Sequence, residues 1–367
     1  MLLQGHVDVV PVAGQDWSRP PFAGDEADGF VWGRGALDMK GGVAMMIAAL
    51  LRARERGLAP RGDVLLCVLS DEESGSDHGA GFLVSEHREL FEGVRYSLGE
   101  FGGFTLHVAG RRFAPIGLSE KQVCWMRGTV RGPGGHASLP MRGGTMGRLA
   151  EILRRLDRGR LPVHVTPIVR RSVEALAAGL PPPLGLPLRG LLVPSLADRL
   201  LDAIGDRAAL FDPVLHNTVN ATVVRGGDKV NVVPGEIELM LDGRVLPGFD
   251  AGDIVSEVSA LAGPHLELEV DRFDPGGPAE PDTGLWDVLA GALRDQDPGV
   301  RPMPYLMPAV SDGRFFARLG IQNYGFLPMR LPEGFEFTGL VHAADERIPT
   351  EAVEFGTQAM LRVLERF

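Results

Sequence analysis

The chain has 367 residues, which predicts two domains at the usual size of about 150 residues each. Hydrophobic residues make up 44% of the chain and charged residues 23%, a globular composition that excludes a disordered chain. The net charge of −11 argues against a nucleic-acid binder and against a basic protein of the membrane surface.

The first hundred residues alternate between strand-like and helix-like patterns. Residues 1–10 and 63–70 are apolar, and the second run predicts a strand covered on both faces. Between them, residues 41–56 have a helical pattern, and Gly57 suits the left-handed position that follows a helix. A strand, a helix and a strand at this spacing predict a mainly parallel sheet, whose ligands gather at the carboxyl ends of the strands.

The middle of the chain has the mixed pattern of a small α+β domain. A stretch rich in proline and leucine at 157–213 is either a linker or an inserted pair of helices. Helical spacing at 195–204 favours helices packed on the second domain. The expected elements of the domain itself are strands at 122–130, 217–224, 236–245 and 265–272, and helices at 145–156 and 250–261.

The end of the chain returns to the first pattern. Residues 284–294 are helical, residues 320–326 form a strand, and a last helix begins near residue 351 with Thr350 as its N-cap. The predicted fold class is therefore α/β. Residues 1–115 and 278–367 form a catalytic domain with a mainly parallel sheet, interrupted by an inserted α+β domain at 116–277 that contains the Pro/Leu-rich insertion.

Cysteine usage and hydropathy indicate the compartment. Cys67 and Cys124 stand in apolar stretches and are expected to be buried thiols, since two cysteines cannot make a disulfide framework. The charge-free stretch at 175–188 contains three consecutive prolines and is too short to span a bilayer. No signal pattern follows Met1, so we expect a cytoplasmic protein without a membrane anchor.

Carboxylate and imidazole groups gather in five short segments that end strand-like runs or lie in glycine-rich loops. Histidine and carboxylate together form a ligand set that zinc accepts. His6 and Asp8 share one face of a strand, so the Asp8 carboxylate can orient the His6 ring. Each segment alone is more often a solvated turn, and only their joint order favours a metal site. The segments are Gly5–Asp8, Gly33–Gly41, Asp71–Glu73, Gly99–Gly103 and Val341–Glu346.

In this combination the sequence resembles the M20 metallopeptidases, a family of aminoacylases, carboxypeptidases and amino-acid deacylases with two zinc ions. The resemblance begins with His6–Pro11, Gly33–Gly41 and Asp71–Glu73. The closing His342–Glu346 and the long insertion are most similar to the aminoacylase and carboxypeptidase S branches. Further similar segments are Trp17–Phe22, Gly134–Ser138, Asn231–Pro234, Arg244–Gly248 and Pro308–Asp312.

The resemblance implies a site with two Zn²⁺, for which Co²⁺ or Mn²⁺ can substitute. One zinc would be held by His6 and Glu100, the other by Glu73 and His342, and Asp38 would bridge both. A shared water would lose its proton to a neighbouring carboxylate and attack the amide carbonyl. The other implied catalytic residues are Glu72 as the general base, Asp8 as the group that orients His6, and His136 as the oxyanion donor.

Three more residues are implied to contact the substrate. Arg244 offers a planar fork for an α-carboxylate, and Asn231 would add a hydrogen bond at the same end. Ser311, in the similar segment Pro308–Asp312, is the third of these residues. On the residues alone, two alternatives stay open: His136 as an exposed turn residue, and Arg244 as a surface or interface ion-pair partner.

The implied function is zinc-dependent hydrolysis of the amide bond of N-acyl amino acids or short peptides, releasing an amino acid. One alternative is a narrow biosynthetic deacylase acting on acetylornithine or succinyl-diaminopimelate. Another is a catalytically impaired relative that acts as a binding protein. The resemblance also implies a homodimer through the inserted domain, with His136 completing the partner's site. Relatives carry some tens of residues before the His6 strand, so we expect either a misassigned start or a truncated amino-terminal part here.

Overall fold

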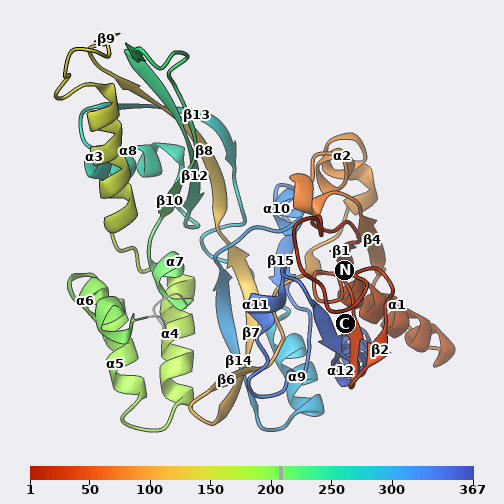
Figure 1. Ribbon diagram of the computed structural model, residues 1–367. Helices are drawn as coiled ribbons and strands as arrows, with labels where there is room; N and C mark the ends of the chain where they lie inside the picture. Colours follow the sequence, from red (N-terminus) through yellow and green to blue (C-terminus); the bar gives the residue numbers. More distant parts are fainter. Residues whose placement is uncertain (206–209) are drawn as a thin grey trace.

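The larger part of the molecule is built on one central sheet. A computed structural model describes residues 1–205 and 210–367, and Figure 1 shows its larger and smaller parts. The strands of the central sheet are β1 (Leu2–His6), β4 (Leu65–Leu69), β5 (Tyr96–Gly99), β6 (Leu106–Val108), β7 (Arg111–Glu120), β14 (Val300–Met307) and β15 (Gln322–Gly325). Their order is β14-β7-β15-β5-β1-β4, with β6 beside β7. Four pairs, β1–β4, β1–β5, β15–β5 and β14–β7, are parallel, which confirms the predicted α/β class.

Helices cover both faces of this sheet. Successive side chains of a strand point to opposite faces, and β1 shows this directly. Leu3 packs in the large core cluster that also contains Met45 and Met360, whereas Leu2 packs with Phe315 and Phe316 in a separate cluster. The helices of the first cluster include α1 (Lys40–Glu55), α9 (Trp286–Gln296) and α12 (Thr350–Arg366), and those of the second are α2 (Ala80–Glu86) and α10 (Gly313–Ala317).

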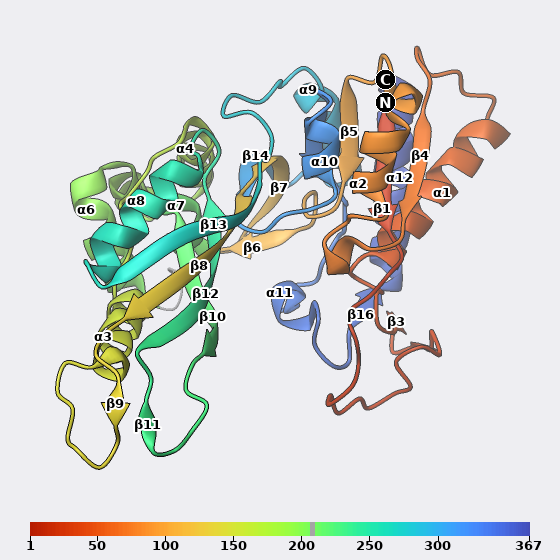
Figure 2. The ribbon, with the colours of Figure 1, turned by 90° about the horizontal axis from the view of Figure 1, so that it is seen from above.

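The smaller part is an antiparallel sheet covered by two helices. Its strands are β8 (Gln122–Arg131), β10 (Thr218–Arg225), β12 (Glu236–Val245) and β13 (Leu266–Asp274), in the order β10-β12-β8-β13. The helices α3 (Thr145–Arg158) and α8 (Ala251–Ala262) pack on it through Ile152, Leu239 and Val258. A separate pair of short strands, β9 (Gly135–His136) and β11 (Val232–Val233), lies at the tip of this part (Figures 1 and 2).

The Pro/Leu-rich stretch forms helices, but they pack on the larger sheet. It contains α4 (Pro167–Gly179), α5 (Gly185–Arg189), α6 (Pro194–Ile204) and α7 (Asp212–Leu215). The prediction that these helices pack on the second domain is wrong. The buried stripe of α4 with Ile168 and Val173 joins the core of the larger part, together with Ile116 of β7 and Val300 of β14. These two strands lie at one end of the large sheet, where α4 covers their apolar side chains.

The chain passes from the larger part to the smaller one at Glu120–Lys121. The predicted boundary at 115 falls inside β7, which stays paired with β14 to Glu120. Lys121 is fully buried and its ammonium donates to the carbonyl oxygens of Pro213 and His216, at 2.9 Å each. These bonds tie the crossing point to the end of the insertion, and the chain returns after β13.

Three local predictions need correction. β4 is an edge strand of the described sheet, so Val68 is 48% exposed and the strand is not covered on both faces. For the same reason Cys67 is only partly buried, whereas Cys124 is fully buried. Thr350 does not cap α12: the helix begins at Thr350 itself, and its hydroxyl donates to the Gly29 carbonyl at 2.7 Å.

Two small features complete the part that carries the site. A three-stranded sheet is formed by β2 (Glu26–Ala27), β3 (Phe30–Trp32) and β16 (Arg347–Pro349), and the short helix α11 (Phe337–Leu340) precedes His342. In residues 1–205 and 210–367, no helix has the length and apolar character needed to cross a bilayer.

Candidate metal centre and active site

His6 ends β1 and lies at the centre of an acidic cluster. Its Nε2 is 3.1 Å from Asp38 Oδ1 and 3.5 Å from Glu100 Oε2. The opposite ring nitrogen, Nδ1, is 3.1 Å from the carbonyl oxygen of Asp8, which can only accept a hydrogen bond. Nδ1 therefore carries the proton when the ring is neutral, and the lone pair of Nε2 faces the carboxylates. A histidine held in this tautomer is ready to bind a metal ion.

Asp38 stands between two histidines. His342 Nε2 is 3.2 Å from the other Asp38 oxygen, Oδ2, and 3.0 Å from Glu73 Oε1. One carboxylate thus presents one oxygen to each imidazole. The two donor sets share only Asp38: we call His6, Asp38 and Glu100 the first set, and His342, Asp38 and Glu73 the second set. The first set is buried, whereas His342 is 49% exposed and opens the second set to solvent.

The protonation equilibria of this cluster favour the binding of cations. Burial raises the pKa of Glu100 well above its usual value and also raises that of Glu73. Burial would lower the pKa of His6, but its hydrogen bonds to Asp38 and Glu100 raise the pKa to about 12, and the bond to Asp38 raises that of His342 to about 9. Carboxylates that are costly to ionise beside histidines that hold protons indicate a site that divalent ions would satisfy in place of protons.

The donor distances support the same interpretation. His6, Asp38 and Glu73 each offer an atom, and these atoms lie within 4.8 Å of one another. The same is true of His6, Glu72 and Glu100. The five predicted ligands are therefore brought together, with Glu72 beside the first set. Imidazole and carboxylate donors of this kind suit zinc, and also cobalt or manganese.

Glu72 and Glu73 lie on a one-turn 3₁₀ helix (Glu72–Ser74) that follows β4, and Asp8 holds this turn from one side. The Asp8 carboxylate accepts hydrogen bonds from the backbone N–H groups of Glu72 at 3.2 Å and Glu73 at 3.1 Å. One of its oxygens is also 3.4 Å from His6 Nδ1. Asp8 therefore touches the His6 ring, as predicted, and also fixes the turn that carries the predicted base.

Arg314 holds the turn from the other side, a contact that sequence reasoning missed. This buried residue of α10 donates to the carbonyl oxygen of Gly75 at 3.0 Å and to the hydroxyl of Ser76 at 3.2 Å. Its Nη1 lies 3.9 Å from Glu72 Oε1. Burial, followed by the charge of Asp312, raises the pKa of Glu72 to about 8. Ser76 is buried at a φ of +65°, so the turn is held in a conformation that few non-glycine residues adopt.

His136 and Asn231 lie together, but not at the metal cluster. β9 pairs with β11, and the Ala137 N–H donates to the Asn231 carbonyl at 3.0 Å. Both residues are exposed at the tip of the smaller part, and Figures 1 and 2 show this tip at the end away from β1. The Ser138 backbone N–H donates to His136 Nδ1 at 3.2 Å, so Nε2 carries the ring hydrogen. His136 thus presents a free donor to solvent.

Arg244 and Asn231 cannot bind the same end of a substrate within one chain. Asn231 precedes the start of β12 and Arg244 is near its end, so the strand residues 236–243 separate them, about 26 Å. Joint binding of one substrate end by these two residues therefore requires a second copy of the chain. The Arg244 guanidinium also holds an internal partner: its Nε and Nη2 donate to the Asp242 carboxylate at 2.7 and 3.0 Å.

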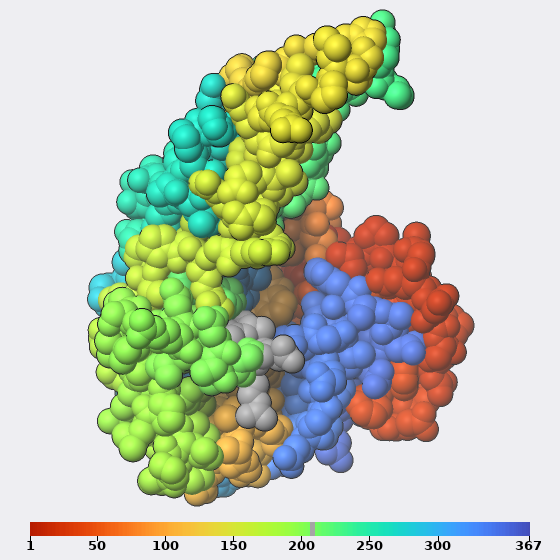
Figure 3. Space-filling view, turned by 60° about the vertical axis from the view of Figure 1, so that its left-hand side comes forward, coloured from red at the N-terminus to blue at the C-terminus, as the bar shows by residue number. Residues whose placement is uncertain are grey.

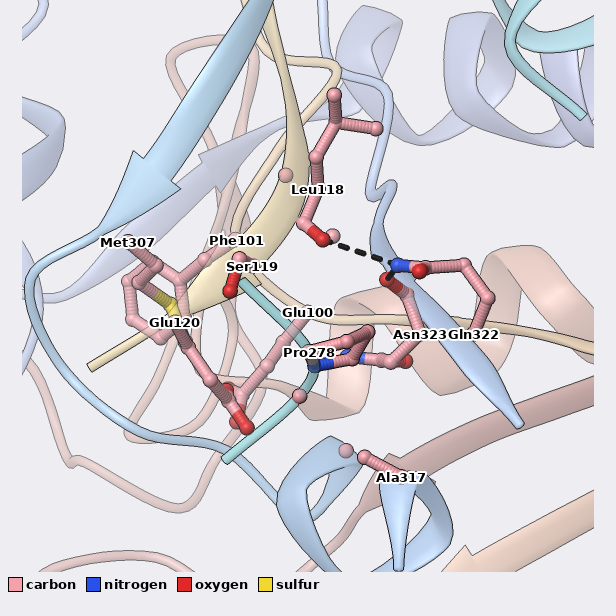
Figure 4. Close-up of a pocket in the computed structure, with 14 residues that line it drawn as sticks. Glu100, Phe101, Leu118, Ser119, Glu120, Pro278, Met307, Ala317, Gln322 and Asn323 are labelled. Atoms are coloured by element: carbon pink, nitrogen blue, oxygen red, sulfur yellow. Dashed lines mark hydrogen bonds between the residues drawn. The ribbon is translucent and has the colours of Figure 1, made fainter. Parts of the chain in front are cut away.

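Ser311 is buried behind the metal cluster. It is 1% exposed, and its hydroxyl donates to Glu120 Oε2 at 2.7 Å. Glu120 and Glu100 lie in the wall of the same small cavity, which Figure 4 shows in close-up. The resemblance had implied that Ser311 contacts the substrate. In this structure its hydroxyl is not accessible to a substrate. It places Ser311 in a hydrogen-bonded layer behind the ligand Glu100.

Comparisons with known proteins cover almost the whole chain. Residues 2–366 match peptidase family M20/M25/M40. An N-fatty-acyl-amino acid synthase/hydrolase from Danio rerio, PM20D1.1, is 30% identical over 366 residues, which cover 96% of this chain and 69% of the relative. A probable carboxypeptidase S-like 2 from Dictyostelium discoideum is 27% identical, covering 95% of this chain and 68% of the relative. The crystal structure of an M20 family metallo-carboxypeptidase from Sulfolobus solfataricus shares the fold, with a TM-score of 0.68 at 17% identity over 99% of this chain and 84% of that one.

Proposed function

Because the chain belongs to peptidase family M20/M25/M40 and is a hydrolase of amide bonds, we propose that it releases an amino acid from N-acyl amino acids or short peptides with the help of two zinc ions. The observation that carries the proposal is Asp38, whose two oxygens face two histidines at 3.1 and 3.2 Å. A carboxylate in that position suits a bridge between two ions. The first and second sets would then each supply three protein donors and leave room for water and substrate.

Each residue of the cluster has one task in this proposal. The first set and the second set would hold one ion each, and when bound the ions would polarise the amide carbonyl and lower the pKa of the attacking water. Glu72 would take the proton of that water and pass it to the leaving nitrogen. Asp8 and Arg314 keep the turn with Glu72 in place. His136 would donate its Nε2 hydrogen to the oxyanion from a second copy of the chain.

An aromatic group beside the cluster supports an apolar acyl group in the substrate. Phe337 stacks on Phe104 with ring centroids 4.6 Å apart and meets Phe101 edge-on at 6.3 Å. Phe101 directly follows the ligand Glu100, and Phe337 is in α11, which leads to His342. An apolar wall at this position would favour burial of a hydrocarbon chain.

Metal content and a substrate panel test the proposal together. Protein reconstituted with zinc and freed of excess metal should contain two zinc ions per chain. It should hydrolyse members of a panel of N-acyl amino acids and dipeptides, and removal of zinc by a chelator should stop turnover until zinc is returned. A zinc content near zero after reconstitution would refute the metal site. Full zinc content with no turnover on any member of the panel would favour the binding-protein alternative.

Arg244 is expected to select substrates with a free α-carboxylate. Asp242 uses the Nε edge of the guanidinium, and the remaining N–H groups can bind a substrate carboxylate. Amidated substrates should therefore lose about 10- to 100-fold in kcat/KM, and Arg244→Ala should remove most of that difference. Arg225→Ala is the matched control, because Arg225 pairs with Glu238 on the same sheet. Equal rates on free and amidated substrates in the wild type would refute this role.

A further inference from the structure

A buried ion pair connects the two loops that carry Asp38 and His342. Arg34 lies in the glycine-rich loop before α1, and Glu346 lies just before β16. Arg34 Nη1 donates to Glu346 Oε2 at 2.7 Å, and the two side chains are 1% and 0% exposed. A pair of charges this deeply buried needs further hydrogen bonds to be tolerated, and of the Arg34 guanidinium nitrogens only Nε has no partner in the described part of the chain. The remaining bonds of the pair lead to the main chain of the proposed ligands.

Glu346 fixes the backbone of the shared ligand. Its second oxygen, Oε1, accepts hydrogen bonds from the backbone N–H groups of Leu37 at 2.8 Å and Asp38 at 3.2 Å. The Asp38 backbone is therefore held by a carboxylate that belongs to neither donor set.

Arg34 fixes the backbone of His342. Its guanidinium donates to the carbonyl oxygens of His342 at 3.2 Å and Ala343 at 3.1 Å. It also donates to the side-chain oxygen of Gln15, whose amide nitrogen in turn donates to the His342 carbonyl at 2.8 Å. His342 has a φ of +64°, a left-handed conformation that a residue other than glycine adopts only when its surroundings impose it. Arg34 and Gln15 supply that constraint.

We propose that Arg34 and Glu346 are positioning residues that set metal affinity chiefly in the second set. This inference rests on the proposed function, since it requires the cluster to bind metal. Two of the three donors of the second set, Asp38 and His342, depend on the ion pair for their backbone positions. In the first set only Asp38 does. His6 lies in β1, which is paired with β4 and β5, and Glu100 directly follows β5, so the central sheet holds both.

A general loss of stability would look different, and the chain offers a matched control. Arg112 of β7 and Asp297, which follows α9, form a pair of similar length, 2.7 Å, in which Asp297 is 3% exposed and Arg112 41% exposed. None of the proposed metal ligands is bonded to either residue in the described part of the chain. Arg112→Met should therefore lower the melting temperature without changing metal binding.

The test is zinc titration against a chelator competitor in full-length protein, with thermal unfolding measured alongside. Wild type and Arg112→Met should bind two zinc ions. Glu346→Gln and Arg34→Met should bind one zinc ion about 10- to 100-fold more weakly and the other, which shares only Asp38 with it, by a clearly smaller factor. Gln15 is partly exposed, so Gln15→Ala is a milder change and should weaken the binding of the same zinc ion by a smaller factor. This variant keeps the proposal testable if the variants at the buried positions do not fold.

The outcomes separate the two proposals. Wild type with no zinc would overturn both the metal site and this inference. Two zinc ions in the wild type and unchanged affinities in every folded variant, Gln15→Ala included, would overturn only the inference. Equal weakening of the binding of both zinc ions would also overturn the inference, because the ion pair would then support the whole cluster and not chiefly the second set.

Discussion

Glu72→Gln is expected to lower kcat by about 10²- to 10⁴-fold while both metal ions stay bound. Glutamine keeps the size of the side chain but cannot take a proton from water. Glu72 belongs to neither donor set, and Asp8 and Arg314 fix the turn through backbone groups and Ser76, which the substitution leaves intact. The measurement is kcat on the best substrate of the panel, with zinc content determined on the same sample.

The neighbouring glutamate provides the contrast. Glu73 Oε1 lies 3.0 Å from His342 Nε2, so Glu73→Gln should weaken the metal ion of the second set. Glu86→Gln, at an exposed position of α2, should change neither activity nor metal content. A Glu72→Gln enzyme within tenfold of wild-type kcat would show that another group takes the proton.

The proposed ligands that follow strands come together for a topological reason. His6 ends β1, Glu72 and Glu73 follow β4, and Glu100 follows β5. These strands are parallel neighbours, so their carboxyl ends meet at one edge of the sheet. Residues that follow successive strands in the sequence therefore lie close together in the structure. The main division into a sheet domain and an inserted α+β domain followed from the same alternation of strand and helix patterns.

The supporting contacts could not be predicted in the same way. Arg34 and Glu346 are 312 residues apart, and Arg314 reaches Ser76 across 238 residues. No local pattern marks such partners, because only the packed fold brings them together. The insertion shows a related limit. Helical spacing at 195–204 indicated a packed helix, which is α6, but the sequence did not tell whether the larger or the smaller sheet offers the uncovered apolar surface.

The exposed position of His136 fits the proposal of a site shared between two copies of the chain. Figure 3 shows the smaller part as an arm that projects from the body of the molecule, and the β9–β11 tip is exposed at its end. Asn231 lies at the same tip, far from Arg244 of its own chain. The edge strand β10 also exposes Val223 and Val224, at 39% and 50%. If two chains associate through the smaller part, the tip of one can supply His136 and Asn231 to the other.

Mixing two inactive variants is expected to restore activity. His136→Ala should lower kcat by about 10²- to 10³-fold, since it removes the proposed oxyanion donor, and Glu72→Gln removes the base. In a heterodimer of these chains, the site with intact Glu72 receives an intact His136 from its partner. Random exchange makes half of the dimers mixed, with one working site each, so activity should return to about a quarter of the wild-type value.

If Glu72 and His136 act within one chain, every site in the mixture lacks one of them and activity stays at the level of the single variants. Subunit exchange is verified with differently tagged chains, and a wild-type enzyme that is fully active as a monomer would also refute the shared site.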